Sequence, residues 1–544
     1  MPRKIVLVSG SVASGKTTLV TRLCQEFDNV HFVKTKEVIR ELALKKLGHE
    51  IESERRAMQL FGDRLDRETK GVWVRDALRR KLAQLGPPEA QAVVIVDAVR
   101  KPEQIKKIRA SYGYSVVHIH LRAPKDVLTE RYKSRNSGLR ELNSFAAVAT
   151  NSTEARIEDL ERIADIVVDT KRSLRDDVLV RAASYLGLYT RTYDRNVDII
   201  VGGQFGSEGK GHIASYLARE YQVLVRVGGP NAGHKVYFDD SPYTHHQLPS
   251  GTLRNPLARL VVAPGAVLNA HLLMKEIADC KVDAQRLTID PRAMIISPKD
   301  VASERGLTER ISSTGQGVGL ATARRITDRG KKDVKLAGDI KELGPFTRRS
   351  AWEVLEQAYS RGDKVLVEGT QGAGLSLYHG QYPYVTSRDT SVGGCLSEAG
   401  ISPSRVRKIV MVCRTYPIRV QNPEGGTSGD LSQEISWEIV SRRSRIKLAQ
   451  LEESEKTSTT NRRRRVGEFD WALLRRASAI NGPTDVALTF ADYLDRRNEG
   501  ARRYEQLRSE TIRFIEEVER VAAAPVSLIS TRFDFRSVID RRYW

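Results

Sequence analysis

Short apolar runs alternate with stretches of helical periodicity along the first third of the chain. Residues 4–9 (KIVLVS) predict a buried strand, Gly10–Thr17 a loop, and Thr18–Phe27 a helix. Helical patterns also lie within Glu50–Leu85. Three further apolar runs predict strands at 93–97, 115–121 and 166–169. Strands that alternate with helices are typical of a parallel α/β sheet.

This alternation is interrupted at Gly187–Asn196 (GLYTRTYDRN), which has no clear period and is rich in turn-forming and charged residues. At 197–202 (VDIIVG) a second apolar strand leads into a second glycine loop, and the rest of the chain again has an α/β pattern. We therefore expect two domains, residues 1–188 and 197–544, joined by a linker at 189–196. The polar and basic stretch Ser441–Arg465 predicts a mobile loop.

The composition is that of a globular protein, with 544 residues, 40% of them apolar and 29% charged. No run approaches the ~20 apolar residues of a membrane span, and the first apolar run is too short for a signal peptide. The four cysteines are scattered, with no CxxC spacing and no histidine at ligand spacing. We expect reduced thiols, a cytoplasmic location and no membrane partner.

The formal net charge of +21 and the isoelectric point of about 9.8 call for an anionic explanation. Basic residues are interleaved with acidic ones along the whole chain. This distribution favours small phosphorylated ligands held in pockets, and an effect on solubility is equally compatible. A nucleic-acid partner is therefore not expected, because only the charge supports it.

Residues 10–17 (GSVASGKT) match the phosphate-binding pattern G-x-x-x-x-G-K-[ST] in full. The motif lies between a predicted strand and a predicted helix, where backbone N–H groups and the helix N-terminus bind phosphate. We expect Lys16 to neutralise the β- and γ-phosphate oxygens and Thr17 to ligate Mg²⁺. Gly10, Gly15 and Thr18 complete the expected nucleotide-phosphate site.

Four further residues are candidates for phosphoryl transfer in this domain. Asp97 ends a predicted strand and is expected to face Mg²⁺ or a substrate hydroxyl; an ordinary strand-end aspartate is the alternative. Arg100, Arg131 and Arg135 are candidates for clamping phosphates. Arg131 and Arg135 are four residues apart on one helix face, so a solvated face explains these two equally well.

Residues 1–185 resemble the small P-loop kinases of nucleosides, nucleoside monophosphates and dephospho-coenzyme A. The resemblance rests on the glycine loop, on VVIVDAVRKPEQIKKIR (93–109) and on EARIEDLERIADIVVDTKRS (154–173). It implies a kinase-like parallel sheet and a phosphotransferase, and it leaves the acceptor open.

The second glycine loop, residues 202–212 (GGQFGSEGKGH), is not of the same kind, because Lys210 lies between glycines and no Ser or Thr follows it. Alone it is a weak signal. Further segments follow in order: RVGGPNAGHKV (226–236), HHQLPSGTL (245–253), SSTGQGVG (312–319), VEGTQGAGLSLYHGQYPYVTSRDTSVGG (367–394) and TSTTNRRRRVGEFD (457–470). Together they resemble the adenylosuccinate synthetase family, whose members carry GDEGKGK, NNAGHT, LHLLPSG, EGAQG, YPYVTS and TTGRRRRTGWLD.

This resemblance implies a ligase in two steps. The γ-phosphate of a nucleotide moves to the purine O6, and the aspartate amine then displaces it at C6. His234 falls at the position of the general acid, for which an imidazole is suited. The resemblance also implies a homodimer. It assigns catalysis to Ser207, Lys210, His234 and Gln371, donor phosphates to Gly206, Glu208, Gly209 and Gly211, the acceptor nucleotide to Asn231, Thr314, Gln371 and Thr386, and Mg²⁺ to Ser207 and the Gly233 carbonyl.

The basic segment at 457–470 corresponds to the family loop that grips the aspartate carboxylates. Thr459, Thr460, Arg462 and Arg464 fall on its binding positions. Guanidinium groups suit this task because their fork of donors matches a carboxylate. Without the flanking TT and VGEFD, a solvated basic run or a nucleic-acid patch would explain the arginines better.

Position 207 departs from the family, whose members carry an aspartate that ligates Mg²⁺ and removes the N1 proton of inosine monophosphate (IMP). Ser207 is a poor base and a weak ligand at neutral pH. A short hydroxyl leaves room for the 2-amino group of guanine and accepts a hydrogen bond from it. With STGQGVG and TYPIRVQNPEGGTSGD (415–430), it resembles a phage and archaeal branch that joins aspartate to dGMP. We expect dGMP or GMP rather than IMP.

The donor and subunit contacts depart as well. Phe490-Ala491-Asp492 replaces the guanine-reading Lys-x-Asp, and STRFDF (530–535) replaces STGPDR. These changes favour ATP or dATP over GTP, with Asp492 as the candidate reader of the donor base. In ATARRITDRG (321–330), Arg325 or Arg329 is a candidate for reaching the acceptor phosphate of a neighbouring subunit.

Alternative functions remain open. One is an ordinary IMP-using adenylosuccinate synthetase of purine biosynthesis with a single substituted base. Another is a nucleotide-sensing or anti-phage defence protein that acts on nucleotide pools. An inactive enzyme is the least favoured, because His234, the glycines and the arginine loop are intact.

Overall fold

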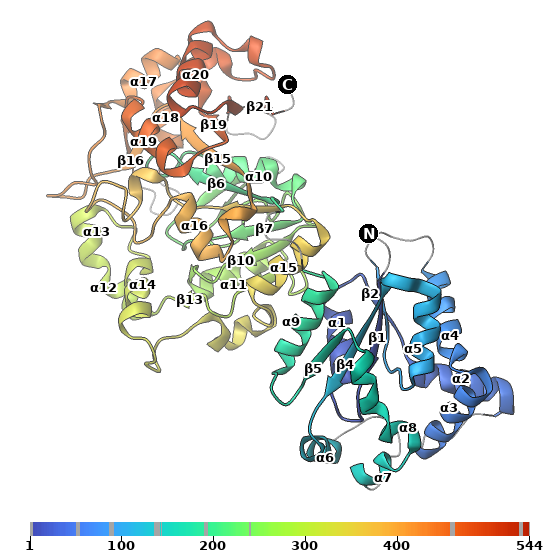
Figure 1. Ribbon diagram of the computed structural model, residues 1–544. Coiled ribbons are helices and arrows are strands. Elements are labelled where there is room, and N and C mark those ends of the chain that lie inside the picture. The colour runs from blue at the N-terminus through green and yellow to red at the C-terminus, as the bar shows by residue number, and fades with distance from the viewer. Residues whose placement is uncertain are drawn as a thin grey trace. The chain divides into compact units, whose positions relative to one another are not determined.

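The computed structural model describes residues 4–49, 55–85, 92–134, 142, 144–189, 194–238, 241–456, 463–532 and 537–542. Contacts divide the chain into two compact units, Met1–Tyr189 and Thr190–Trp544. Each unit is an α/β structure with a parallel sheet, as the sequence predicted (Figure 1). None of the described helices is long and apolar enough to cross a membrane.

The sheet of the first unit has the strand order β2-β3-β1-β4-β5, and all of its strands are parallel. The expected strands are present. β2 was missed because it has only four residues and the polar His31 interrupts its apolar run. β1 lies between β3 and β4, so successive strands are added first on one side of β1 and then on the other. In such sheets, ligands bind beside this point at the carboxyl ends of the strands. The strands are β1 Lys4–Ser9, β2 Val30–Val33, β3 Val93–Val96, β4 Val116–Arg122 and β5 Ile166–Asp169.

Helices cover both faces of this sheet (Figure 1). α1 and α9 pack Leu23 and Leu179 against one face of β1, and α3, α4 and α5 pack Phe61 and Ile105 against the other. α1 begins two residues before the expected start, directly after the glycine loop. The helices are α1 Lys16–Glu26, α2 Thr35–Leu47, α3 Arg55–Thr69, α4 Val72–Gln84, α5 Pro102–Tyr112, α6 Lys125–Lys133, α7 Phe145–Ala149, α8 Ser152–Ala155 and α9 Arg175–Leu186.

The second unit has a larger sheet with the order β12-β10-β7-β14-β6-β15-β19-β20-β21. All neighbours are parallel except β21, which is antiparallel at the edge. β6 lies between β14 and β15, so the second glycine loop follows a central strand. The strands are β6 Val197–Gly202, β7 Val223–Arg226, β10 Arg259–Val262, β12 Leu287–Ile289, β14 Val365–Glu368, β15 Val406–Arg414, β19 Asp485–Thr489, β20 Val526–Ser530 and β21 Val538–Asp540.

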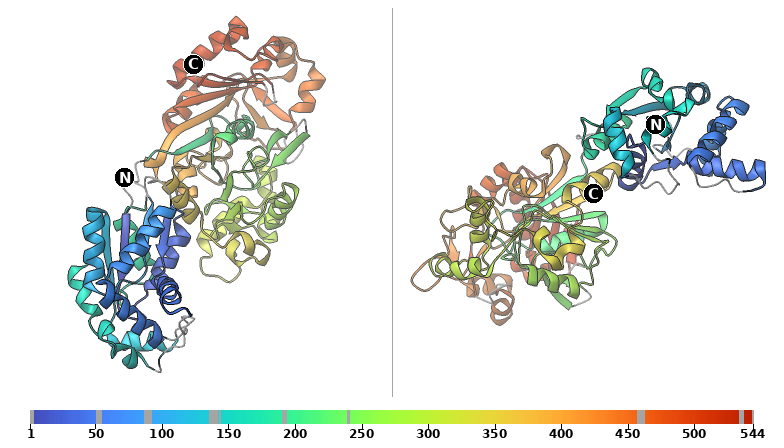
Figure 2. Two further views of the ribbon diagram at one scale, coloured as in Figure 1. Left: turned by 90° about the vertical axis from the view of Figure 1, so that its right-hand side faces the viewer. Right: turned by 90° about the horizontal axis from the view of Figure 1, so that it is seen from below.

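α15, α16, α19 and α20 pack on one face of this sheet, and α10 and α11 pack on the other (Figure 2). Smaller sheets stand outside it. β8 His234–Phe238 pairs with β9 Ser241–His245, and β11 Val267–Leu268 pairs with β13 Met294–Ile295. A three-stranded sheet has the order β16-β18-β17, with β16 Ile418–Val420, β18 Arg464–Gly467 and β17 Glu434–Ile435. The helices are α10 Lys210–Leu217, α11 Ala270–Asp279, α12 Pro298–Ser303, α13 Arg305–Ile311, α14 Val318–Thr327, α15 Ala351–Arg361, α16 Val392–Ala399, α17 Trp437–Ser444, α18 Leu448–Ser454, α19 Trp471–Asn481 and α20 Ser509–Ala522.

The prediction of a mobile loop at 441–465 is wrong for the part of this stretch that the structure describes. α17 ends in this stretch, α18 lies within it, and β18 begins at its end. Val440, Ile446 and Leu451 are buried against Tyr416 and Tyr493. These few apolar residues are widely spaced among arginines, so the polar composition hid them. Residues 457–462 lie outside the described residues.

Candidate active site

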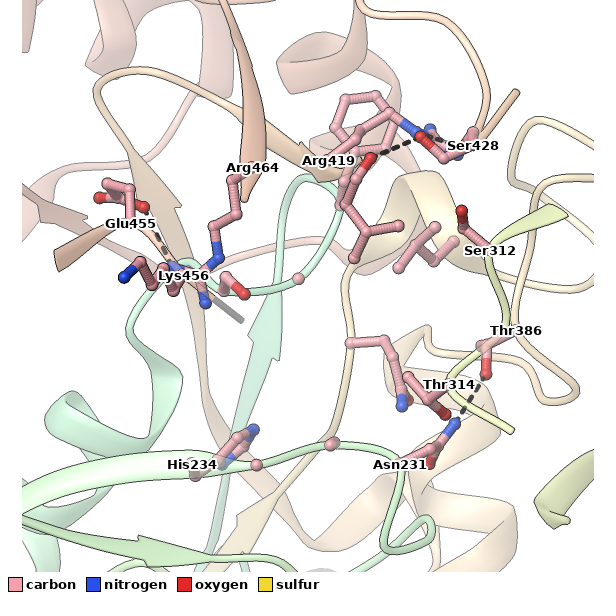
Figure 3. Close-up of a pocket in the computed structure, with 18 of the residues that line it drawn as sticks. Asn231, His234, Ser312, Thr314, Thr386, Arg419, Ser428, Glu455, Lys456 and Arg464 are labelled. Carbon is pink, nitrogen blue, oxygen red and sulfur yellow. Dashed lines mark hydrogen bonds and ion pairs between the residues drawn. The ribbon is translucent and has the colours of Figure 1, made fainter. Parts of the chain in front are cut away.

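A cavity of about 1740 Å³ opens in the second unit, where segments that follow β6, β7, β14, β15, β19 and β20 meet. These segments leave the carboxyl ends of parallel strands, the edge at which open α/β sheets bind ligands. Figure 3 shows labelled side chains from several of them around this space. The cavity exceeds the ~300–1,000 Å³ that holds one small ligand, so it has room for more than one.

The second glycine loop forms part of the cavity wall. Gly206, Ser207, Gly209, Lys210 and Gly211 all line it. Ser207 is exposed there, and its backbone φ of 55° is in the left-handed region. Its hydroxyl is therefore available to a ligand.

Glu208 lies in the same loop, but its side chain is fully buried and does not line the cavity. Its carboxylate accepts hydrogen bonds from the backbone N–H groups of Gln204 and Gly206, at 3.1 and 2.9 Å, and pairs with Lys210. Through these contacts Glu208 shapes the loop from behind.

Gly211 is the second residue of α10 and lies next to the segment that carries His234. A Cβ atom at position 211 would lie 2.6 Å from the Cβ of His234 and 3.1 Å from the Ser250 hydroxyl. Such a contact is too close for any side chain, so the absence of a Cβ lets the loop and His234 approach each other.

His234 is held by a buried network at the cavity wall. Its Nδ1 contacts both the Glu368 carboxylate and the Arg226 guanidinium, the latter at 2.6 Å. Arg226 also donates to Glu368 at 2.6 Å, and the Ser250 backbone N–H donates to the same carboxylate at 2.7 Å. Because Nδ1 is engaged in this way, Nε2 is the ring atom left for a ligand.

The charges of this network set its pKa values. Burial, aided by the charge of Arg226, lowers the pKa of His234 to about 4. Burial alone would raise the pKa of Glu368, but Arg226 and the hydrogen bond with His234 lower it to about 2. At neutral pH His234 is therefore a neutral imidazole beside the ionised carboxylate of Glu368.

Asn231, Thr314, Gln371 and Thr386 also line the cavity. The Asn231 amide lies 3.5 Å from the Thr386 hydroxyl (Figure 3). The side-chain oxygens of Asn231 and Gln371 are buried without a hydrogen-bond partner among the described residues. Buried polar atoms are normally paired, so these two are free to bind a ligand.

Arg464 lines the cavity with its guanidinium bound to Glu455 at 3.0 Å. Glu455 also accepts from Arg414, at 2.7 Å, and from the Tyr493 hydroxyl, at 2.8 Å. Arg414 in turn donates to the Ser207 carbonyl at 3.3 Å, so this network reaches the glycine loop. The other residues expected to bind aspartate, Thr459, Thr460 and Arg462, lie outside the described residues.

Comparison with known proteins agrees with this arrangement. The adenylosuccinate synthetase family model matches residues 199–349 and 335–499. Adenylosuccinate synthetases from Thermococcus onnurineus and Archaeoglobus fulgidus are 39% and 37% identical, each over 63% of this chain and 98% of the relative. The chain belongs to the adenylosuccinate synthetase family. The second unit is thus its adenylosuccinate synthetase domain, a ligase that uses a nucleotide, a purine mononucleotide and aspartate.

Two solved structures cover 64% of the chain. A fully ligated adenylosuccinate synthetase from Plasmodium falciparum is 22% identical, with all of that chain covered and a TM-score of 0.56, and supports the fold. The succinoaminodeoxyadenylate synthetase of cyanophage S-2L is 26% identical, with 96% of that chain covered and a TM-score of 0.53; it was solved with dGMP and with dATP as an energy donor.

A model described as an AAA domain matches residues 5–162, so the first unit is a P-loop, kinase-like domain fused to the adenylosuccinate synthetase domain. In its glycine loop Gly10 has φ 136°, and a Cβ there would lie 2.1 Å from the Leu121 carbonyl. Gly15 precedes α1, and Thr17 and Thr18 are exposed in its first turn. Lys16 donates to the Gly10 and Ser11 carbonyls at 2.6 and 2.9 Å.

Three of the four remaining candidates of the first unit lie among the described residues. Asp97 accepts from the backbone N–H and hydroxyl of Thr35, at 2.9 and 2.8 Å, and burial raises its pKa although Arg100 and Lys16 oppose the change. Arg100 pairs with Glu154 at 3.0 Å. Arg131 donates to the hydroxyl and carbonyl of Thr170, both at 2.9 Å. Arg135 lies outside the described residues.

Sequence reasoning missed several site residues of the adenylosuccinate synthetase domain. Arg226, Glu368 and Arg414 are the last residues of the buried strands β7, β14 and β15. A charge at the end of an apolar run is the same signal that marked Asp97, so these three were detectable. Glu455 had no such signal, because it follows a short helix in a polar stretch.

Arg329, a candidate for contacting the acceptor phosphate, is exposed beyond α14 and does not line the cavity of its own chain. Arg325 donates to the Pro264 carbonyl at 3.1 Å. Among the described residues, no group of three or more His, Cys, Asp or Glu side chains could hold a metal ion.

Proposed function

We propose that the adenylosuccinate synthetase domain joins L-aspartate to C6 of a guanine mononucleotide, dGMP or GMP, through a 6-phosphoryl intermediate. The observation that carries the proposal is Ser207, an exposed hydroxyl on the glycine loop of an otherwise intact site. An aspartate here would occupy more of the space beside the purine, whereas serine leaves room for the 2-amino group of guanine. The cyanophage structure with dGMP supports this acceptor.

In this mechanism the purine lies between His234 and the Asn231, Thr314, Gln371 and Thr386 group. The Nε2 of His234 faces the purine O6, while Arg226 and Glu368 hold Nδ1. As the phosphoryl group moves from the donor nucleotide to O6, the purine loses its N1 proton to solvent and the donor leaves as a nucleoside diphosphate. The negative charge of the phosphoryl group raises the proton affinity of the imidazole, which takes up a proton, and Glu368 stabilises the imidazolium. His234 then protonates the leaving phosphate oxygen when the aspartate amine attacks C6.

The donor is ATP or dATP in preference to GTP. Its phosphates lie along Gly206–Gly211, where Lys210 supplies a cation. Arg464 binds either the carboxylates of the aspartate or the phosphates of the nucleotide. The donor set of this site fits a Mg²⁺ carried mainly by the phosphates, because the two protein ligands that we expect for it, the Ser207 hydroxyl and the Gly233 carbonyl, carry no charge. Bound there, Mg²⁺ would neutralise charge on the transferring phosphate.

The first unit is proposed to be a phosphotransferase that acts on a nucleoside or nucleotide. Lys16 and Thr17 hold the triphosphate and its Mg²⁺, and Asp97, Arg100 and Arg131 lie on the acceptor side. Either it makes a nucleotide that the ligase uses, or it phosphorylates the product of the ligase. Replacement of Lys16 by alanine tests this: phosphoryl transfer to added mononucleotides should be lost, while aspartate-dependent turnover continues.

The domain is proposed to act as a homodimer, with Arg329 of one subunit directed to the acceptor phosphate of the other. The exposure of Arg329 supports such a role.

The acceptor assay decides the central proposal. Purified full-length protein is given aspartate, Mg²⁺ and ATP with dGMP, GMP or IMP in turn, and phosphate release is measured against a control without aspartate. Higher kcat/KM with dGMP or GMP supports the proposal. Preferred turnover of IMP would support the second candidate, an ordinary adenylosuccinate synthetase, which the 39% and 37% identical relatives favour.

A further inference from the structure

One end of the cavity lies against the segments that follow β19 and β20. Phe490 and Arg532 line both the main cavity and a small hollow beside it, and Gly209 lines the same two spaces. The Thr489 hydroxyl, at the end of β19, donates to the Glu208 carbonyl at 2.7 Å. This bond fixes residues 489–493 against the glycine loop. A nucleotide whose phosphates occupy the loop therefore has its base within reach of this segment.

Asp492 lines the cavity in this segment. Its Oδ1 is buried and has no hydrogen-bond partner among the described residues. The cations nearby are engaged elsewhere: Arg532 pairs with Glu499 at 3.3 Å, and Arg414 pairs with Glu455 at 2.7 Å. None of the described cations forms an ion pair with Asp492.

Arg414 is also restrained from its other side. Its guanidinium stacks on the Phe490 ring at 4.1 Å, in addition to its bonds with Glu455. It therefore stays with Glu455 rather than turning to Asp492. Among the described residues, the carboxyl of Asp492 has two acidic neighbours, Glu455 and Glu499, and no cation that forms an ion pair with it.

These surroundings favour the protonated form of the carboxyl. Burial is the main cause, and the charges of Glu499 and Glu455 add to it. The backbone N–H of Asp492 itself and the charge of Arg414 oppose it, and the pKa of Asp492 rises to about 7. The hydroxyl of the adjacent Tyr493 is bound to Glu455 and offers Asp492 no stabilising charge. A neutral carboxylic acid is therefore well populated at neutral pH.

We propose that Asp492 recognises the donor base as a neutral carboxylic acid, and that this form selects adenine over guanine. The proposal deepens the donor site of the proposed ligase, on which it rests. The selectivity then depends on one proton, and it weakens as Asp492 ionises.

The hydrogen-bonding edges of the two purines explain the selection. Adenine presents an acceptor at N1 and a donor at N6, and a carboxylic acid matches both, since its O–H donates to N1 while its C=O accepts from N6. Guanine presents donors at N1 and N2, and an ionised carboxylate accepts from both. A carboxylic acid would instead direct its O–H at a guanine donor and leave one polar group unpaired, which is costly in a buried site.

Binding of the triphosphate analogues adenylyl and guanylyl imidodiphosphate, with Mg²⁺, tests this in the full-length protein. The first glycine loop is silenced by Lys16→Ala, so that calorimetry reports the second unit. Between pH 7 and pH 9 the Kd of the adenylyl analogue should rise about 50-fold, because the protonated, binding-competent fraction falls from about one half at pH 7 to about one hundredth at pH 9. The guanylyl analogue should not weaken.

Two variants distinguish the ionisation of the Asp492 carboxyl from the ionisation of other groups. Asp492→Asn keeps one donor and one acceptor but does not ionise, so adenylyl binding should become independent of pH while guanylyl binding stays weak. Glu499→Gln removes an acidic neighbour and releases Arg532, so the midpoint of the pH dependence should move to lower pH. If Asp492 had only a structural role, Glu499→Gln would leave the midpoint of the pH dependence unchanged.

The proposal is overturned if the adenylyl Kd of the Lys16→Ala protein is constant from pH 7 to pH 9. It is equally overturned if folded Asp492→Asn loses adenylyl binding while it retains the guanylyl analogue. Neither measurement requires aspartate or an acceptor nucleotide. A result against the proposed guanine acceptor in the turnover assay can therefore be told apart from a result against the proposed role of Asp492.

Discussion

Arg226 and Glu368 each end a buried strand, and their side chains meet at the imidazole of His234. Arg226 and Glu368 are each only 2% exposed, so neither charge is solvated by bulk water. A buried charge without its partner is costly, which ties the position of His234 to the integrity of both neighbours.

Glu368→Gln is expected to impair turnover more than binding. The variant cannot stabilise an imidazolium at His234, so kcat for aspartate-dependent phosphate release should fall by ~10²–10⁴, with a smaller change in KM. It also leaves Arg226 without its carboxylate, at a cost of ~3–5 kcal/mol in unfolding free energy.

The matched control is Asp198→Asn. Asp198 is a buried carboxylate on β6 whose Oδ1 accepts a hydrogen bond from the Nε of Arg407 at 2.9 Å. It does not line the cavity. It should lose stability in the same way and keep kcat for its folded fraction. Equal loss of kcat in both variants would contradict a positioning role for Glu368.

Ser207→Asp is expected to exchange the acceptor preference. The longer, charged side chain fills the space proposed for the guanine 2-amino group and supplies a base for the N1 proton of IMP. The kcat/KM for dGMP and GMP should fall by ~10–200-fold, the range that one added group commonly produces in a pocket, and that for IMP should rise. Steady-state kinetics with each acceptor check this, with Ser207→Ala as the control without a charge; unchanged preference in Ser207→Asp would argue against the assignment.

At the scale of elements, helices begin directly at both glycine loops. α1 starts at Lys16 and α10 at Lys210, so each loop lysine is a first helical residue. The regular strand–loop–helix order was readable from the sequence. β2, α17 and α18 were not, because their buried residues are too few and too widely spaced to produce a periodic pattern.

Gly211→Ala is expected to disturb both stability and turnover. The new methyl group would meet the Cβ of His234 at 2.6 Å, and a forced shift of this kind costs ~1–3 kcal/mol. Gly306→Ala is the control, since it also lies in a helix, α13, but has no atom within 4 Å of the added Cβ. It should gain ~0.5–1 kcal/mol. Denaturant unfolding and aspartate-dependent turnover check both; similar behaviour of the two would contradict the close approach.

At the scale of the whole molecule, each unit has its own hydrophobic core and its own glycine loop. The core of the first unit includes a polar cluster under its loop. Ser9, the residue before Gly10, bonds to His118 at 2.7 Å and to His120 at 2.8 Å, and all three are buried. Burial lowers the pKa of both histidines to about 4.

This cluster predicts that the first unit loses stability in mild acid. Unfolded histidines titrate near pH 6.5, so between pH 6.5 and pH 4 unfolding takes up protons. Each histidine then lowers the unfolding free energy by up to ~1.4 kcal/mol per pH unit as the pH falls. Amide exchange of β1 and β4 in the full-length protein, corrected for intrinsic rates, should be faster at pH 5.5 than at pH 7.

His118→Gln with His120→Asn is the matched variant, because each amide places a polar nitrogen near the ring atom that contacts Ser9 and neither titrates. It should remove most of the dependence on pH. An unchanged dependence in the double variant would assign the acid sensitivity to other groups.

The sequence by itself determined the two α/β units, the family and a set of candidate residues that line the cavity, because glycine loops and ordered motifs are local patterns. Only the tertiary structure decided how these residues act. It turns Glu208 away from the cavity, pairs Arg464 with Glu455, and leaves the buried Oδ1 of Asp492 without a hydrogen-bond partner among the described residues. The reason is physical: the charge state of a buried group depends on neighbours from distant strands, and a sequence does not contain those distances.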